Sequence, residues 1–420
     1  MAEPHKNVQQ VVDHLYKQHF GKMVASLLRF SKDIDLETAE DLVQDAFAAA
    51  LSHWETQLPD NPAAWIFTVC RNKALNKLKA DKKFLRLHQA PEPAPELVSP
   101  AITFTADFPD DEQLRLLFAC AHPDLAPKVQ VVITLKYVIN FKVATIANLL
   151  GMTIDGVDKL LLRARKKIKE EKILLVPPAP QAMQQRLPIV HKIIYLIFNE
   201  GHTSAEGKEL LREDLCEEAL ILNKAILDSQ MGNIDTLALY ALMLLNAARF
   251  KARFDENGEL LDLEQQDRSL WNQDLIKLGD YYFKQSKGNL KQSKEPPLSS
   301  YHIEAYIAWL HSTATSFATT DWRTIAKLYK QLLPNPFVEL NYAIALYYAG
   351  EVNNAFSLLH NLQRSPFMNS YYLLNATLGK LYLQENNHAQ AAVYFSKTLD
   401  QTRSSAEANY IRKMLLKLNL

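Results

Sequence analysis

Lysine and arginine gather in two short runs within the first 175 residues, and phosphate binding is the chemistry that such runs support. The first run lies between Arg71 and Arg86 and holds seven basic residues against one acidic residue, Asp81. The second lies between Lys159 and Lys169 and holds six basic residues. The whole chain balances 47 basic against 47 acidic residues, so these runs are local features. Cations clustered along one helix are the electrostatic signature of nucleic-acid binding.

Two other groups of residues raise the question of metal binding and of catalysis. Cys120 and His122 are separated by one residue and have no second ligand pair, so we expect no metal site. The second group combines carboxylates with a histidine: Asn199, Glu200, His202 and Asp214. Such polar groups at helix junctions usually cap and cross-link a packed domain. Since the chain also lacks a glycine-rich phosphate loop, we predict no enzymatic activity and no cofactor.

The second basic run belongs to a segment whose spacing predicts a helix-turn-helix. The pattern predicts a short helix from Val143 to Leu150, a tight turn at Gly151, and a second helix capped by Thr153. The apolar stripe of the second helix is Val157, Leu160, Leu161 and Ala164. Its opposite, charged face would enter a major groove, with base contacts near its start and phosphate contacts toward its end. The alternative is a basic amphipathic hairpin with a solvated face.

Proline-rich segments divide the chain into three helical blocks. Glycine is scarce, with 11 residues, and apolar positions recur every three to four residues, which predicts an all-α fold. The residue before a proline is disfavoured in helices, so we expect an extended linker at 89–107 and a break at 176–180. We also expect a loop at 286–300. The three predicted domains are residues 8–88, 108–174 and 184–420.

The last block carries a two-copy repeat. Residues 341–359 align with 377–395, which places Ala355 over Ala391 within a segment spanning about 336–400. Small residues where two helices cross are typical of stacked helix pairs, and the spacing resembles a tetratricopeptide (TPR) repeat. Two ordinary helical hairpins are the alternative. Both interpretations predict a helical stack, and such stacks usually bind a partner or brace a neighbouring domain.

Composition predicts a globular protein of the cytoplasm. The chain is 48% hydrophobic and 22% charged, the balance of a folded protein. No apolar stretch reaches the roughly 20 residues that span a bilayer, so we expect no membrane association. The three cysteines, Cys70, Cys120 and Cys216, are odd in number and far apart, which argues against a disulfide framework and for a reducing compartment.

The two basic segments resemble the two DNA-binding regions of bacterial sigma factors. Val143–Lys169 resembles region 4, which reads the upstream (−35) promoter element. Ala39–Phe47 is similar to the region 2 helix that docks on RNA polymerase, and Ile66–Lys79 is similar to the helix that recognises the downstream (−10) element. Since only a linker joins the two regions, the resemblance implies the extracytoplasmic-function type of sigma factor.

This resemblance implies three sets of contact residues. The polymerase-binding set is Asp41, Gln44, Asp45 and Phe47. The −10 set is Trp54, Arg71, Asn72, Lys73, Asn76, Lys77 and Lys79. The −35 set is Thr153, Asp155, Asp158, Lys159, Arg163 and Lys166. In the family, the loop before the −10 helix, here Glu55–Asn61, holds an extruded base. Trp54 could instead be a core residue. Acidic residues at the start of the −35 helix suit a cytosine amino group or a helix cap better than a phosphate.

The third block resembles the C-terminal extension of a subset of these sigma factors. The similar segments are Tyr195–Ser204, Arg212–Ala219 and Leu263–Trp271. We therefore predict a sigma factor that binds core RNA polymerase and promoter DNA, with a C-terminal domain that regulates it in cis or binds a signalling or regulatory protein. Two other functions fit the sequence: a stand-alone helix-turn-helix regulator and a helical-repeat scaffold.

Overall fold

The computed structural model of this chain is built from helices throughout the residues that it describes. The described residues are 3–31, 33–55, 57–88, 111–176, 178–202, 211–229, 231–256, 261–290, 299–332, 334–402 and 405–418. Apart from one bridge residue at Phe254, all regular structure in these ranges is helical, which confirms the all-α prediction. The chain forms two compact units, Met1–Ile194 and Tyr195–Leu420. The predicted linker at 89–107 lies outside the described residues.

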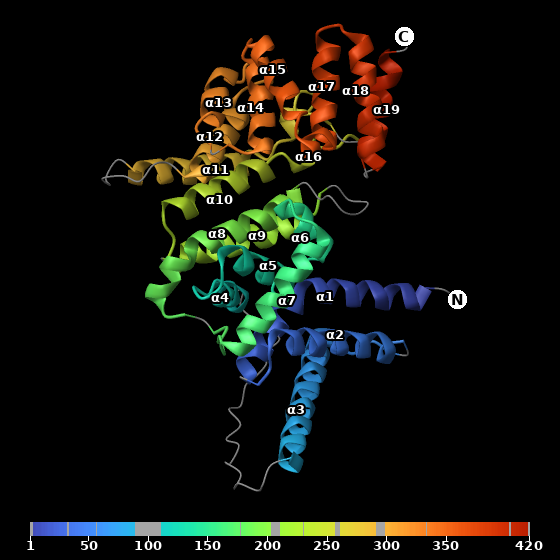
Figure 1. Cartoon of the computed structure of the whole chain (residues 1–420), viewed down its shortest axis with the longest axis vertical. Helices are drawn as coiled ribbons and strands as arrows, with labels where there is room; N and C mark the ends of the chain where they lie inside the picture. Colours follow the sequence, from blue (N-terminus) through green and yellow to red (C-terminus); the bar gives the residue numbers. More distant parts are fainter. Residues whose placement is uncertain are drawn as a thin grey trace. The chain divides into compact units, whose positions relative to one another are not determined.

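The first three helices form one half of the N-terminal unit. They are α1 (Glu3–Phe30), α2 (Leu36–His53) and α3 (Pro62–His88). Helix α2 begins where Asp35 accepts the Thr38 N–H at 2.9 Å. Helix α3 begins where Asn61 accepts the Ala64 N–H at 3.0 Å, with proline at the first helical position. Helices α1 and α2 pack together, and α3 contacts both of them and then extends beyond α2 (Figure 1).

Five further helices complete this unit: α4 (Asp111–Cys120), α5 (Pro127–Tyr137), α6 (Val143–Leu150), α7 (Ile154–Glu170) and most of α8 (Pro180–His202). Gly21 of α1 lies so close to the end of α5 that a Cβ there would be 2.0 Å from the Val138 carbonyl oxygen. Lys136 of α5 donates to Glu40 of α2 at 2.6 Å. These contacts join the two halves of the unit into one body.

The C-terminal unit begins with four α-helices and two short 3-10 helices around a buried centre. They are α9 (Glu213–Asp228), α10 (Ile234–Ala247), η1 (Phe250–Ala252), η2 (Arg268–Leu270), α11 (Gln273–Leu290) and α12 (Ser300–Thr313). Helix α10 is apolar nearly all round because α9, α11 and α12 pack on it. The loop predicted at 286–300 was wrong at its start: α11 continues to Leu290, and the buried Ser286 hydroxyl donates to the Phe283 carbonyl at 2.7 Å.

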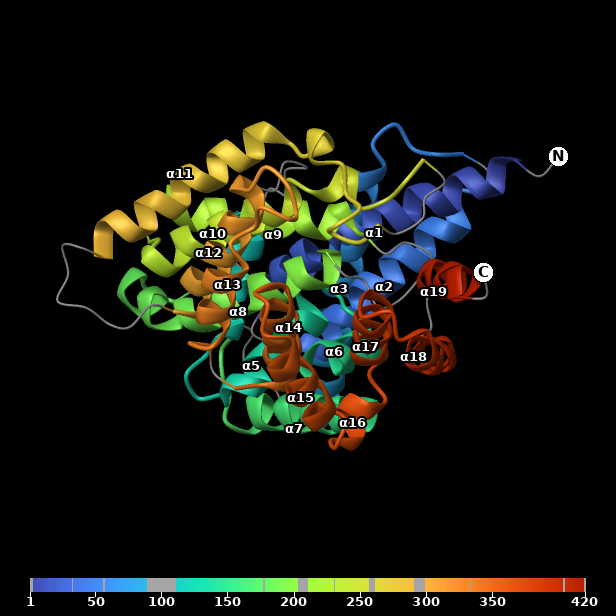
Figure 2. The same cartoon turned by 90° about the horizontal axis from the view of Figure 1, so that it is seen from above.

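The remaining described helices pack largely each against the next along the chain. They are α13 (Trp322–Tyr329), α14 (Pro336–Tyr348), α15 (Val352–Leu362), α16 (Pro366–Asn369), α17 (Tyr372–Gln384), α18 (His388–Gln401) and α19 (Ser405–Leu418). Helix α14 pairs with α15, and α17 pairs with α18, as Figures 1 and 2 show. Ala355 and Ala391 are fully buried. A Cβ on Gly379 would lie 2.6 Å from the Phe395 ring, so close crossing of α17 and α18 requires glycine there.

Candidate nucleic-acid and polymerase interface

Helices α6 and α7 form the predicted helix-turn-helix. Gly151 ends α6 in the left-handed conformation (φ 59°, ψ 42°), which glycine adopts without steric cost. Thr153 then caps α7, because its side-chain oxygen accepts the Gly156 N–H at 3.1 Å. The buried residues of the two helices include Ile146, Ala147, Val157, Leu161 and Ala164, whereas Leu160 is half-buried. Turn, cap and apolar stripe thus confirm this prediction.

The six residues of the predicted −35 set lie on the exposed side of this motif. Lys159 contacts Asp155 at 2.6 Å, and Lys166 approaches Glu170 at 3.8 Å. Exposed pairs of this kind contribute little to stability, so their cations can exchange a carboxylate for a phosphate at low cost. The Thr153 side chain is the exception within the set, since its oxygen already serves as the cap of α7.

The predicted −10 residues on α3 form a broad polar face opposite a buried one. Asn72, Asn76, Lys77 and Lys79 are exposed, and Arg71 and Lys73 are half-buried. On the other side, burial raises the pKa of the Cys70 thiol to about 12, so Cys70 is a neutral core residue. Helix α3 therefore presents cations and amides along one face, which is the combination that a single nucleic-acid strand requires.

Trp54 differs from the rest of the −10 set because it is only 2% exposed. Its ring lies edge-on to Trp65, with the centroids 5.4 Å apart. The side chain therefore packs in the core at the end of α2, where aromatic pairs contribute to stability. Stacking of a base on this ring would require the surrounding side chains to move.

Helix α2 divides into a buried and an exposed face, as predicted. Leu42, Val43 and Ala46 are buried, and Asp41, Gln44 and Asp45 are exposed. Phe47, the fourth residue of the predicted polymerase-binding set, is 3% exposed, and its ring lies edge-on to Tyr16 at 4.9 Å. In this conformation, three residues of the predicted set lie on the surface of α2, and Phe47 packs in the core beneath the helix.

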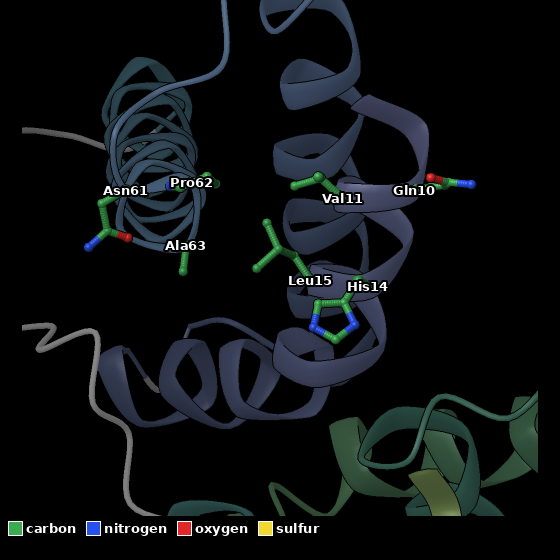
Figure 3. A pocket seen from close by; sticks show the side chains of 7 residues that line it. All are labelled: Gln10, Val11, His14, Leu15, Asn61, Pro62 and Ala63. Atoms are coloured by element: carbon green, nitrogen blue, oxygen red, sulfur yellow. The ribbon is translucent and has the colours of Figure 1, made fainter. Parts of the chain in front are cut away.

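A pocket of about 400 Å³ lies between α1 and the start of α3. Figure 3 shows Val11 and Leu15 of α1 facing Ala63 at the beginning of α3. Asn61 and Pro62, at the end of the loop before α3, complete this side of the rim. The lining of this pocket thus combines apolar side chains with the polar residues Gln10, His14 and Asn61, beside the start of α3.

Sequence reasoning missed a second hollow, of about 440 Å³, in the N-terminal unit. Its lining combines residues of α2, α5, α6 and α7, among them Glu40, Lys136 and Asp158. At its edge, Arg165 of α7 donates to Glu37 of α2 at 2.8 Å. These pairs are about 100 residues or more apart in the chain, so no local pattern could have indicated them.

Comparison with known proteins agrees with this arrangement. Residues 15–84 match the model of sigma-70 region 2, and residues 115–168 match the model of sigma-70 region 4. This chain contains regions 2 and 4 of the sigma-70 family, in that order. Sigma factors bind core RNA polymerase and promoter DNA to direct transcription initiation, and they are not enzymes. The predictions of these two partners, of a role in transcription initiation and of no enzymatic activity are therefore confirmed.

The similarity extends over the rest of the sigma factor. Residues 186–287 match a family of unknown function, DUF6596. An uncharacterized protein of Rhizobium meliloti (strain 1021) is 30% identical over 404 residues, which cover 93% of this chain and 92% of that protein. No solved structure matches the chain. Among the described helices of the sigma factor, none is long and apolar enough to cross a membrane.

Proposed function

We propose that this protein is a cytoplasmic sigma factor of the extracytoplasmic-function type whose C-terminal unit regulates it in cis. The observation that carries the proposal is the presence of two separate exposed basic helix faces, on α3 and α7, in a chain that also presents a polar face on α2. In this proposal, residues 8–88 bind polymerase and the −10 element, residues 108–174 bind the −35 element, and residues 184–420 regulate.

The −10 element would be read as a melted strand along α3. Arg71, Lys73 and Lys77 would track the phosphates, and the amides of Asn72 and Asn76 would bind base edges. Extruding a base costs a few kcal/mol, which these contacts must offset. The pocket between α1 and the start of α3 is supported as the receiving site because it adjoins the loop before α3 and has room for a base.

The −35 element would be read by α7 in the major groove. Arg163 and Lys166 would contact phosphates, and Asp155 and Asp158 near the start of α7 would accept from cytosine amino groups. Each phosphate contact releases counterions, so promoter binding should weaken steeply as salt rises. This dependence separates phosphate contacts, which set affinity, from base contacts, which set the sequence read.

Polymerase docking would use the exposed residues of α2. Asp41, Gln44 and Asp45 offer two carboxylates and an amide on consecutive turns. Polar side chains of this kind steer association and fix its register. Phe47 would act from the core by holding α2 against α1, through its contact with Tyr16.

Transcription in vitro with core polymerase and a promoter library tests this function directly. The chain should direct initiation at start sites that share two sequence elements. The double variant Lys73→Glu, Lys77→Glu should abolish directed initiation, because two phosphate-binding cations become anions. The control is Lys330, an exposed lysine at the C-terminal end of α13, and Lys330→Glu should leave initiation unchanged. Tight duplex binding without polymerase, and no directed initiation with it, would instead favour the stand-alone regulator.

Regulation in cis rests on the TPR-like stack of α14–α19. Helix pairs with small buried residues at their crossings are typical of repeats that bind peptides or neighbouring domains. Deleting residues 195–420, which keeps the part of α8 that belongs to the N-terminal unit, should therefore change the amount of transcript from the selected promoter at equal protein concentration. Equal activity of the full and shortened chains would refute the regulatory part and leave the sigma activity itself in place.

A further inference from the structure

Three arginines meet near the end of α10 in the C-terminal unit. Arg249 follows the helix, Arg253 follows η1, and Arg268 begins η2. We name these three residues the arginine cluster. All three are half-buried. Cations removed from water normally have carboxylate partners, so the partners of each guanidinium indicate whether the cluster is only structural.

Two of the arginines bind main-chain carbonyls at the ends of helices. Arg268 donates from Nη1 to the carbonyl oxygens of His311 and Ala314, each at 2.6 Å, at the end of α12. Arg253 donates from Nη1 to the carbonyl oxygen of His202, the last residue of α8. Cations are favourable at helix C-termini, so these contacts offset part of the burial of two charges.

The buried charge of Arg249 has weaker hydrogen-bond partners than the charges of Arg253 and Arg268. Its hydrogen bond goes to the neutral amide oxygen of Asn246 at 3.0 Å. Its guanidinium carbon lies 5.9 Å from the centroid of the Trp271 ring, which Arg268 also approaches, at 4.5 Å. Two cations thus share one indole. Burial, and then repulsion by Arg253 and Arg268, lower the pKa of Arg249 to about 10.

Within the described ranges of this unit, no carboxylate lies within ion-pair distance of the cluster. The nearby Glu304 instead accepts the Tyr195 hydroxyl at 2.5 Å. Burial raises the pKa of Glu304 to about 7, so it is only partly ionised at neutral pH. The cluster therefore keeps an excess of positive charge in a partly dehydrated place.

Buried polar atoms around the cluster also lack partners. Trp271 is 2% exposed, yet its Nε1 has no acceptor among the described residues, and Nη2 of Arg268 has none either. Nε2 of His202 and Nδ1 of His311 are likewise buried without a partner in the described part of the chain. Burial and the neighbouring arginines lower the pKa of both histidines, that of His311 to about 3, so both are neutral.

We propose that the arginine cluster binds a phosphate group, either as inorganic phosphate or as part of a phosphorylated small molecule. Unsatisfied buried donors next to uncompensated cations require an acceptor that carries negative charge. Planar guanidinium groups match the oxygens of phosphate in pairs. A phosphate dianion offers at least three acceptor oxygens and two charges, which suits three arginines from different segments better than a single carboxylate does.

The inference is independent of the regulatory role proposed above, because binding is measured without transcription. A purely structural cluster and a ligand site predict opposite effects of Arg249→Gln. If Arg249 only stabilises the fold, its removal lowers the melting temperature. If it serves a ligand, removing this cation, which Arg253 and Arg268 both repel, leaves the melting temperature of the ligand-free chain equal or higher.

The test uses the full chain in thermal unfolding and titration calorimetry, with sodium phosphate, sodium acetate and sodium chloride at equal ionic strength. Phosphate should raise the melting temperature of the unaltered chain, and acetate should not. Arg249→Gln should weaken phosphate binding about tenfold or more, which is the usual effect of losing a charged hydrogen bond. Arg412→Gln, an exposed arginine of α19, should bind phosphate normally.

Two further titrations, with a sugar phosphate and a nucleoside monophosphate, identify the source of the phosphate. Tighter binding of either one than of inorganic phosphate assigns the site to a phosphorylated small molecule, and equal or weaker binding assigns it to the inorganic ion. The proposal is overturned if phosphate acts no differently from chloride or acetate, or if Arg249→Gln retains full phosphate binding.

Discussion

Replacing Gly21 by alanine should destabilise the N-terminal unit, although glycine-to-alanine changes inside helices usually stabilise. Gly21 lies in the interior of α1, where alanine would gain about 0.5–1 kcal/mol of helix propensity. Its Cβ, however, would be 2.0 Å from the Val138 carbonyl oxygen and 3.0 Å from the carbonyl carbon. Both are backbone atoms, which cannot rotate away as a side chain would.

The size of the effect follows from this geometry. To restore van der Waals contact, α1 and the end of α5 must separate by roughly 1 Å or more. Overpacking of a close-packed contact costs about 1–3 kcal/mol. After subtraction of the helix-propensity gain, we expect a net loss of about 1–2 kcal/mol, borne by the packing of region 2 on region 4.

Urea denaturation with hydrogen exchange of peptides from α1 and α5 measures this loss. Exchange should rise in both helices of the variant, because the contact between them opens more often. Gln18→Ala, an exposed change one turn earlier in α1, should stay within about 0.5 kcal/mol of the unaltered chain. If Gly21→Ala is instead more stable than the unaltered chain, regions 2 and 4 do not pack through this contact.

Three further predictions concern single interactions. Glu40→Gln and Lys136→Met should each lower the free energy of unfolding in urea by about 1–2 kcal/mol, because their 2.6 Å ion pair is mostly buried. The double variant should reveal a coupling energy of about 1 kcal/mol between the two residues. Additive losses would show that the two side chains do not interact. Thr153→Ala should lose about 1 kcal/mol and weaken −35 binding, and Thr153→Ser should retain both; equal stability of the two variants would show that the cap is unimportant. The folded pKa of Glu304 is raised from 4.5 to about 7, so its protonated form stabilises the fold fully below pH 4.5. This contribution, about 3 kcal/mol, is lost as pH rises through 7. Glu304→Gln should therefore flatten the melting temperature between pH 5 and pH 8, and an unchanged slope would exclude this carboxyl as its cause.

The sequence by itself determined the local features of this sigma factor. The caps at Asn61 and Thr153, the turn at Gly151 and the two faces of α2 were all predictable. Capping and helical periodicity depend on residues within one or two turns, so a single sequence contains the information. The local prediction failed at Ser286, which looked like the start of a loop, because α11 continues through this residue and its side chain is buried.

Only the tertiary structure decided which side chains remain accessible and which distant charges meet. Phe47 and Trp54 were predicted contact residues, and packing against Tyr16 and Trp65 buries them both. The arginine cluster had no signal in the sequence, because its members are spread over residues 249–268 and meet through the folding of α8, α10 and α12. Local patterns record the interactions of neighbours along the chain, whereas burial and long-range electrostatics depend on what the whole fold brings into contact.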